Sequence, residues 1–172
     1  MHSGQRVLIH AGGGGVGHLA IQIAKARGAQ VITTARADKH ALVRELGADA
    51  IIDPDQDWAK AGIRADIVLD PLGGAVAGRS LDVLRDGGTL SSIAGPWEPA
   101  DDVKAAAAAR GIRTGFTLVE PDRHALIELT RLVEAGSLRP VISDSFRLED
   151  LASAHRRAEQ GHLAGKIVIN VR

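Results

Sequence analysis

The sequence contains no cysteine and no tyrosine, and these two absences exclude several kinds of chemistry. Without cysteine the chain has no disulfide, no thiolate nucleophile and no Cys-ligated zinc site. Without tyrosine it has no tyrosine acid to donate a proton. Aromatic residues make up only 2% of the 172 residues, which argues against a platform that stacks nucleic-acid bases.

An excess of one charge and long apolar runs are absent as well. Lysine plus arginine and aspartate plus glutamate both number 21, so nothing points to nucleic acid or an anionic membrane as a partner. The apolar stretches are far shorter than the ~20 residues of a membrane-spanning helix. Residues 1–4 lead directly into an expected strand, without the segments of a secretory signal. We therefore expect a cytoplasmic protein.

The residues that are present fit one globular domain of the α/β class. The length suits one full domain and is short for two. Short β-rich runs alternate with helical patterns, which predicts a doubly wound parallel sheet in the Rossmann strand order 3-2-1-4-5-6. We expect its six strands at residues 6–10, 30–34, 50–53, 66–70, 89–94 and 112–119.

Helical patterns lie between these strands, and the end of the chain departs from the repeating unit. The first helix follows the glycine cluster and ends at Gly28. Further helices are expected at residues 38–46, 57–61, 74–84, 103–110 and 121–135. The chain then continues as an extended segment, a helix and a strand, at residues 140–146, 148–160 and 166–171. We therefore divide it into a Rossmann domain, residues 1–139, and a C-terminal extension, residues 140–172.

The most informative segment is the glycine cluster after the first expected strand. Gly12, Gly14 and Gly17 form the pattern G-x-G-x-x-G between that strand and the first helix, which is the context of a dinucleotide-binding turn. We expect Gly12 to make the tight turn, Gly14 to let a pyrophosphate approach the backbone, and Gly17 to let the helix lie close to the strand. The N–H groups around Gly15 and Val16 would then hold the phosphates. The alternative is a glycine-rich turn that binds nothing.

The end of the second strand predicts which dinucleotide binds. An NAD site usually places an acidic residue there, to accept hydrogen bonds from the ribose 2′-OH. This strand ends at Thr34 and is followed by Arg36 and Lys39 instead. A guanidinium pairs well with a phosphate, which favours NADPH over NADH. Asp38 could serve as the ribose carboxylate, but we expect it to cap the second helix.

The other strand ends should line the same cleft, because ligands bind at the carboxyl edge of such sheets. We expect them to surround the nicotinamide half of the cofactor. Asp70 has an alternative role as the cap of the following helix. The residues expected at this part of the site are Asp70, Leu72, Ile93, Ala94, Phe116 and Leu118.

Together these segments resemble the zinc-independent, quinone oxidoreductase-like branch of the medium-chain dehydrogenase/reductase family. The resemblance implies a Rossmann domain that carries NADPH, and hydride transfer from NADPH to a quinone, an enone or a related carbonyl-type acceptor. It also implies a GroES-like catalytic domain on which the C-terminal extension would pack. The segments that carry the resemblance are residues 3–9, 12–17, 34–36, 39, 46–49, 66–74, 84–88, 146–155 and 165–168.

The chain begins where the nucleotide-binding domain of that family begins, so we interpret it as a fragment or a naturally short form. We expect it to be weak or inactive alone, and we assign no catalytic residue. The hydroxyls nearest the expected site, Ser91, Ser92 and Thr117, are better explained as cofactor contacts or strand residues. We expect no metal site, because the seven histidines show neither H-x-H nor H-E-x-x-H spacing. His155 and His162 are expected on the surface or packed in the tail.

Three functional hypotheses follow. The first is the NADPH-binding half of an oxidoreductase acting on a small-molecule acceptor. The second is a stand-alone NADPH-binding or sensing module without catalysis. The third is another doubly wound enzyme, such as a methyltransferase, although the acidic residue such enzymes carry after the second strand is missing. The sixth strand would form a sheet edge, and an exposed edge favours pairing, so we expect a homodimer through that edge.

Overall fold

The computed structural model describes residues 1–95 and 99–172, and its main body is a six-stranded parallel sheet. The strand order is β3-β2-β1-β4-β5-β6, which confirms the predicted fold class and topology. The strands are β1 (Arg6–Ile9), β2 (Gln30–Thr34), β3 (Ala50–Ile52), β4 (Ala65–Asp70), β5 (Leu84–Ser92) and β6 (Arg113–Phe116).

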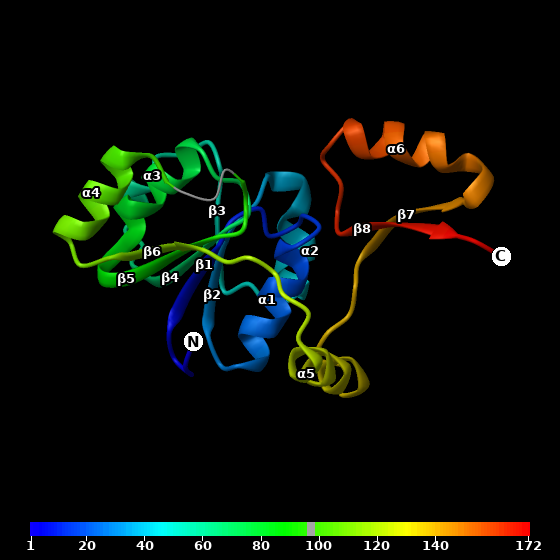
Figure 1. Cartoon of the computed structure of the whole chain (residues 1–172), viewed down its shortest axis with the longest axis horizontal. Helices are drawn as coiled ribbons and strands as arrows, with labels where there is room; N and C mark the ends of the chain where they lie inside the picture. Colours follow the sequence, from blue (N-terminus) through cyan, green and yellow to red (C-terminus); the bar gives the residue numbers. More distant parts are fainter. Residues whose placement is uncertain (96–98) are drawn as a thin grey trace.

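Helices cover both faces of this sheet, with α1 and α2 on one side and α3 and α4 on the other (Figure 1). Successive residues of β1 point to opposite faces. Val7 and Ile9 therefore join the hydrophobic cluster under α1 and α2, whereas Leu8 joins the one under α3 and α4. Burial on both faces explains why β1 is an almost unbroken apolar run. The helices are α1 (Gly17–Ala26), α2 (His40–Glu45), α3 (Ala75–Val83) and α4 (Asp101–Ala109).

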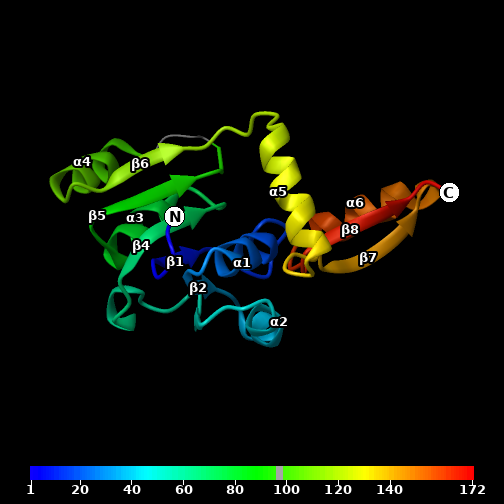
Figure 2. The ribbon, with the colours of Figure 1, turned by 90° about the horizontal axis from the view of Figure 1, so that it is seen from below.

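After β6 the chain forms helix α5 and then a separate lobe beside the main sheet. Figures 1 and 2 show it at the side away from β6, where β7 and β8 pair in parallel and α6 packs against them. The backbone N–H of Gly165 in this lobe donates to the carbonyl of Gly13 at 2.9 Å, so the extension is attached to the glycine-rich loop. The division at residues 139 and 140 stays a prediction. The elements are α5 (Arg123–Glu134), β7 (Ile142–Arg147), α6 (Leu151–Glu159) and β8 (Lys166–Asn170).

Helix α5 lies between the two lobes and is strongly amphipathic, yet every one of its residues is at least partly exposed. Its apolar side chains include Leu126, which is 64% exposed, and Val133, which is 52% exposed. Asp122 caps its start by accepting a hydrogen bond from the backbone N–H of His124 at 2.8 Å. The helix therefore presents an apolar stripe that the described residues, 1–95 and 99–172, leave exposed.

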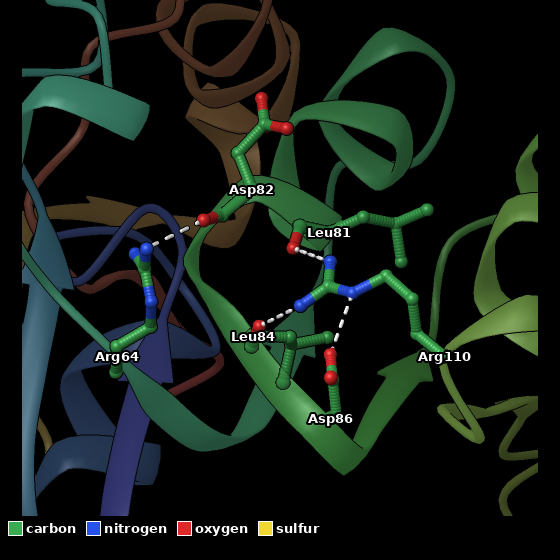
Figure 3. A network of polar contacts seen from close by, with 6 residues as sticks. All are labelled: Arg64, Leu81, Asp82, Leu84, Asp86 and Arg110. Carbon is green, nitrogen blue, oxygen red and sulfur yellow. Dashed lines mark hydrogen bonds and ion pairs between the residues drawn. The ribbon is translucent and has the colours of Figure 1, made fainter.

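Expected boundaries are wrong at the junction of α3 with β5 and at the end of the sixth strand. We expected a helix to run through Leu84 and a strand to begin at residue 89, but β5 already begins at Leu84. Arg110, which follows α4, donates to the carbonyls of Leu81 and Leu84 and pairs with Asp86 at 2.8 Å, so it fixes the junction between α3 and β5 (Figure 3). The sixth strand ends at Phe116 rather than at residue 119.

Asp38 does not cap the second helix as predicted. The chain first forms a short 3-10 helix, Ala37–Lys39, whose N-terminal flanking residue is Arg36, and α2 begins only at His40. Asp38 therefore lies inside a helical turn, where its carboxylate pairs with the Lys39 ammonium at 3.1 Å. Two further 3-10 helices are Ala59–Ala61 and Leu148–Asp150.

Candidate functional site

A cleft of about 510 Å³ opens at the carboxyl ends of β1 and β2. The glycine-rich loop forms its floor, and the turn after β2 forms one wall. The segment after β3 and the end of the C-terminal extension close it further. The lining residues are Ala11, Gly13–Gly15, Thr34–Arg36, Asp38, Lys39, Pro54, Asp55, Leu72 and Gly161–Leu163.

Gly12 and Gly13 occupy the central positions of the tight turn in the glycine-rich loop, as predicted for Gly12. Ala11 has a φ of 52°, in the left-handed region that favours glycine. Its carbonyl accepts a hydrogen bond from the Gly14 N–H at 2.9 Å, which closes the turn. Gly12 is also required for space, because a Cβ there would collide with Thr33 Oγ1.

Gly17 makes the close approach that was expected of it. A Cβ on Gly17 would collide with the carbonyl oxygen of Ala11, so α1 can lie this near β1 only with glycine at that position. Val16 precedes the helix and offers no side-chain cap, and the first turn carries no acidic residue. The positive end of α1 therefore lacks a side-chain anion of its own, which is the arrangement that binds phosphates.

A buried histidine supports the same loop from behind. His18 donates from Nδ1 to the carbonyl oxygen of Gly14 at 2.8 Å, and its ring is fully buried. Burial lowers the pKa of His18, although the hydrogen bond to Gly14 opposes this shift. The imidazole is therefore neutral at physiological pH, and it anchors the loop without adding charge to the cleft.

Arg36 and Lys39 reach the same end of the cleft, as predicted for a phosphate-binding pair. The Arg36 guanidinium donates to Nδ1 of His162 at 2.8 Å, and the stem of Lys39 packs against Gly13. Asp38 also lines this end, and the hydrogen bond from Lys39 lowers the pKa of its carboxyl group. Two cations and one carboxylate therefore face a ligand here.

His162 is exposed, in agreement with the surface position expected for it, but it also lines the cleft, which the sequence did not predict. His162 lies after α6 and has a φ of 57°. Its ring contacts Arg36, which is 126 positions away in sequence, because the extension folds back toward the cleft. A non-glycine residue in the left-handed region is uncommon and often marks a functional position. Local sequence patterns gave no signal for His162, because only a long-range contact brings it to the cleft.

The residues expected around the nicotinamide lie at the same edge of the sheet, but only Leu72 among them lines the cleft. Asp70 is fully buried, and its Oδ1 accepts from the N–H groups of Leu72 and Gly73 at 2.9 Å each. It therefore shapes the turn before α3, whose N-terminal flanking residue is Gly74, and the alternative role of Asp70 as a helix cap is wrong.

Ile93, Ala94, Phe116 and Leu118 follow or end the neighbouring strands, outside the walls of this cleft. The Ile93 N–H donates to the Asp70 carbonyl at 3.0 Å, so the ends of β4 and β5 are joined. Leu118 is 70% exposed. The structure thus encloses one end of the predicted cofactor site and leaves the other end open.

Within residues 1–95 and 99–172, no group of three or more histidine, aspartate or glutamate side chains is placed to hold a metal ion. The sequence supplies no cysteine either. These residues therefore do not fit a zinc site. In the same part of the chain, the helices are too short or too polar to cross a bilayer.

Comparison with known proteins gives consistent matches over the chain. Residues 46–169 match a family model described as zinc-binding dehydrogenase. The zebrafish (Danio rerio) protein named "NAD(P)H oxidoreductase RTN4IP1, mitochondrial" is 32% identical over 97% of this chain and 49% of its own length.

Solved structures agree with the sequence matches. The quinone oxidoreductase from Coxiella burnetii is 39% identical with a TM-score of 0.90, covering 99% of this chain and 54% of that one. Mycobacterial Rv1454c, solved in complex with NADPH, is 27% identical with a TM-score of 0.81 over 99% of this chain and 58% of that one. The chain thus spans about half the length of these relatives.

Proposed function

We infer the function from one premise: the chain belongs to the medium-chain dehydrogenase/reductase family and corresponds to its nucleotide-binding domain. A general oxidoreductase role with a nicotinamide cofactor follows from this membership. We propose that the chain is the NADPH-binding half of an oxidoreductase that transfers hydride from NADPH to a quinone, an enone or a related carbonyl-type acceptor.

One observation carries the choice of cofactor: the uncapped start of α1 and the cations Arg36 and Lys39 face the same cleft. The backbone around Gly14 and Gly15 would hold the diphosphate, because helix N-termini favour anions. Arg36 and Lys39 would hold the 2′-phosphate of NADPH, since a guanidinium pairs with phosphate through two hydrogen bonds. The bound cofactor would supply the hydride, and the protein would orient it.

The chain offers no group that we assign to proton transfer. The Ser91 and Thr117 hydroxyls near the open end lie 3.0 Å apart and hydrogen-bond to each other. We propose that the acceptor site needs walls from a further domain, and that the chain alone is weak or inactive. No metal-dependent step is derived, because the described residues do not fit zinc.

Calorimetric titration with NADPH, NADP⁺, NADH and NAD⁺ tests this proposal. NADPH should bind at least about tenfold more tightly than NADH, because one charge-assisted contact is worth roughly 1.5–3 kcal/mol. Equal affinities would show that Arg36 and Lys39 do not read the 2′-phosphate, and would leave Asp38 as the residue facing a ribose. If none of the four dinucleotides bound, the proposed function would be wrong.

We further propose a homodimer paired through β6, which forms one edge of the main sheet. A monomeric mass in light scattering would contradict it. The cytoplasmic placement also stays a prediction. We propose that its partners are another copy of the chain and a small-molecule acceptor, and not nucleic acid or membrane.

A further inference from the structure

A column of stacked side chains lies beneath the cleft, in the buried space between β1 and α3. The His10 ring stacks on Trp58, with ring centroids 4.7 Å apart and planes 23° apart. The Arg79 guanidinium carbon lies 3.6 Å from the centre of the Trp58 ring. His10 is fully buried, and Trp58 is 3% exposed. A buried imidazole requires partners for both ring nitrogens, so its hydrogen bonds reveal its state.

The partners of His10 fix the position of its proton. The Ser80 hydroxyl lies 2.7 Å from the Val76 carbonyl and donates its single hydrogen there. Ser80 therefore accepts from His10, whose Nε2 lies 2.9 Å away and must carry the proton. Nδ1 of His10 then accepts from the Thr34 hydroxyl at 3.3 Å. A neutral imidazole protonated at Nε2 meets these demands, with Nδ1 as the acceptor for the Thr34 hydrogen.

The charges around His10 agree with a neutral ring. Burial lowers the pKa of His10 to about 4, opposed by the nearby Asp70 carboxylate and assisted by the Arg79 guanidinium. Arg79 faces the ring across Trp58, and Asp70 ends the neighbouring strand β4. The ring is therefore uncharged over the physiological range.

The hydrogen bonds of His10 lead directly to the turn of the glycine-rich loop. Thr34 donates its hydrogen to His10, so its oxygen is free to accept from the Ala11 N–H at 3.0 Å. Ala11 is held in a left-handed conformation that costs a non-glycine residue about 1–2 kcal/mol. The carbonyl of Ala11 in turn receives the Gly14 N–H at 2.9 Å. The shape of the loop therefore depends on a hydroxyl that His10 orients.

The opposite wall of the cleft depends on the same column. Arg79 donates to the carbonyls of Pro54 at 3.0 Å and Gln56 at 2.8 Å. Trp58 donates from its indole nitrogen to the carbonyl of Asp53 at 3.3 Å. Pro54 itself lines the cleft, as does Asp55. The stack of His10, Trp58 and Arg79 thus joins the loop on one side to residues 53–56 on the other.

We propose that His10 is a positioning residue for the dinucleotide site: its neutral, Nε2-protonated ring holds the glycine-rich loop through Thr34 and Ala11, and supports the wall at residues 53–56 through Trp58. The identity of the ligand rests on the proposed function. The positioning itself is a property of the unliganded chain. His10 touches no ligand in this scheme and acts only through its neighbours.

A rescue experiment separates positioning from general stability. His10→Phe keeps a ring against Trp58 but removes both hydrogen bonds, and the dissociation constant of NADPH should rise about tenfold. Ala11→Gly in that background should recover most of the affinity, because glycine adopts the left-handed conformation without help. Ala11→Gly alone should change the affinity less than about threefold. Leu81→Ala, a core change in α3 away from the loop, should leave the affinity unchanged. Failure of Ala11→Gly to recover affinity would overturn the proposal.

A second measurement needs no ligand. Nitrogen-15 NMR of the labelled free chain should show the His10 ring protonated at Nε2 and bare at Nδ1 at neutral pH. The opposite tautomer would overturn the proposal even if NADPH binds. If the native chain binds no dinucleotide, the proposed function fails, and amide exchange at Ala11 still decides on His10. Faster exchange at Ala11 in His10→Phe supports the positioning role, whereas unchanged exchange contradicts it.

Discussion

The two ends of the sheet's carboxyl edge are built differently. Beyond β1, β2 and β3 the edge is closed by the glycine-rich loop, by Arg36 and Lys39, and by residues 161–163 of the extension. Beyond β5 and β6 it is open, and Leu118 there is 70% exposed. The residues that supply the charges and the walls of the closed end all belong to this chain. The difference teaches that the described residues enclose a ligand-sized space at one end of the edge, whereas residues 1–95 and 99–172 leave the other end open.

Replacing one glycine at each end by alanine should give the largest difference in stability. Gly17→Ala would bring a methyl group against the Ala11 carbonyl, a backbone atom that cannot move cheaply, and should destabilise the fold by about 3 kcal/mol. Gly115→Ala on β6 meets nothing within 4 Å and should change stability by less than about 0.5 kcal/mol. Urea denaturation of both variants measures the difference. Equal losses would show that the loop is not the tightly packed end.

The pH dependence of stability should come from His10, which lies buried beneath the closed end. The pKa of His10 is about 4 in the folded chain against 6.5 for an ordinary histidine, so the unfolded state binds more protons between these values. The free energy of unfolding should therefore fall as the pH drops from 6.5 to 4, with His10 contributing about 3 kcal/mol.

Comparison with His10→Phe isolates this contribution, because His18 and the carboxylates titrate in both proteins. The wild-type curve should be steeper across that window, as followed by urea unfolding at successive pH values. Parallel curves would contradict a neutral buried His10.

Arg36→Ala tests the charge at the closed end. NADPH should lose about ten- to a hundredfold in affinity, and NADH should lose much less, since only NADPH carries the 2′-phosphate. Arg113→Ala on β6 is the matched control and should leave both affinities unchanged. Calorimetry with the two cofactors gives the result. Equal losses of NADPH and NADH would remove Arg36 from the phosphate site.

His162→Ala should give the smallest effect. His162 accepts a hydrogen bond from Arg36 and holds that guanidinium in the cleft, so its loss should weaken NADPH by about threefold. His155→Ala on the exposed side of α6 provides the control. A gain in NADPH affinity would instead mean that His162 competes with the phosphate for Arg36.

Much of the closed end could be predicted from the sequence, because its signals are local. Alternation of strand and helix patterns gave the sheet order, and the glycine spacing placed the loop between β1 and α1. Arg36 and Lys39 were found because they follow a strand end directly. Gly12 was correctly predicted as a turn residue, and the structure adds a second reason for glycine there, since a Cβ would collide with Thr33 Oγ1.

The other features of the closed end depend on contacts between residues that local sequence patterns do not reveal. Asp38 was predicted as a cap because its residue type favours that position, but a 3-10 helix begins one residue earlier, at Ala37. His162 reaches the cleft only through the return of the extension. His10 did leave a signal: a histidine ending an apolar strand needs buried polar partners, and Thr34 on the neighbouring strand is within reach.

The hydrogen bond between Gly165 and Gly13 joins positions near opposite ends of the chain. During synthesis the N-terminal loop leaves the ribosome long before the strand that docks on it, and such distant pairings form late. Completion of the cleft is therefore delayed until residues 161–165 have been synthesised, and a nascent chain stalled before them would carry the glycine motif without its full enclosure.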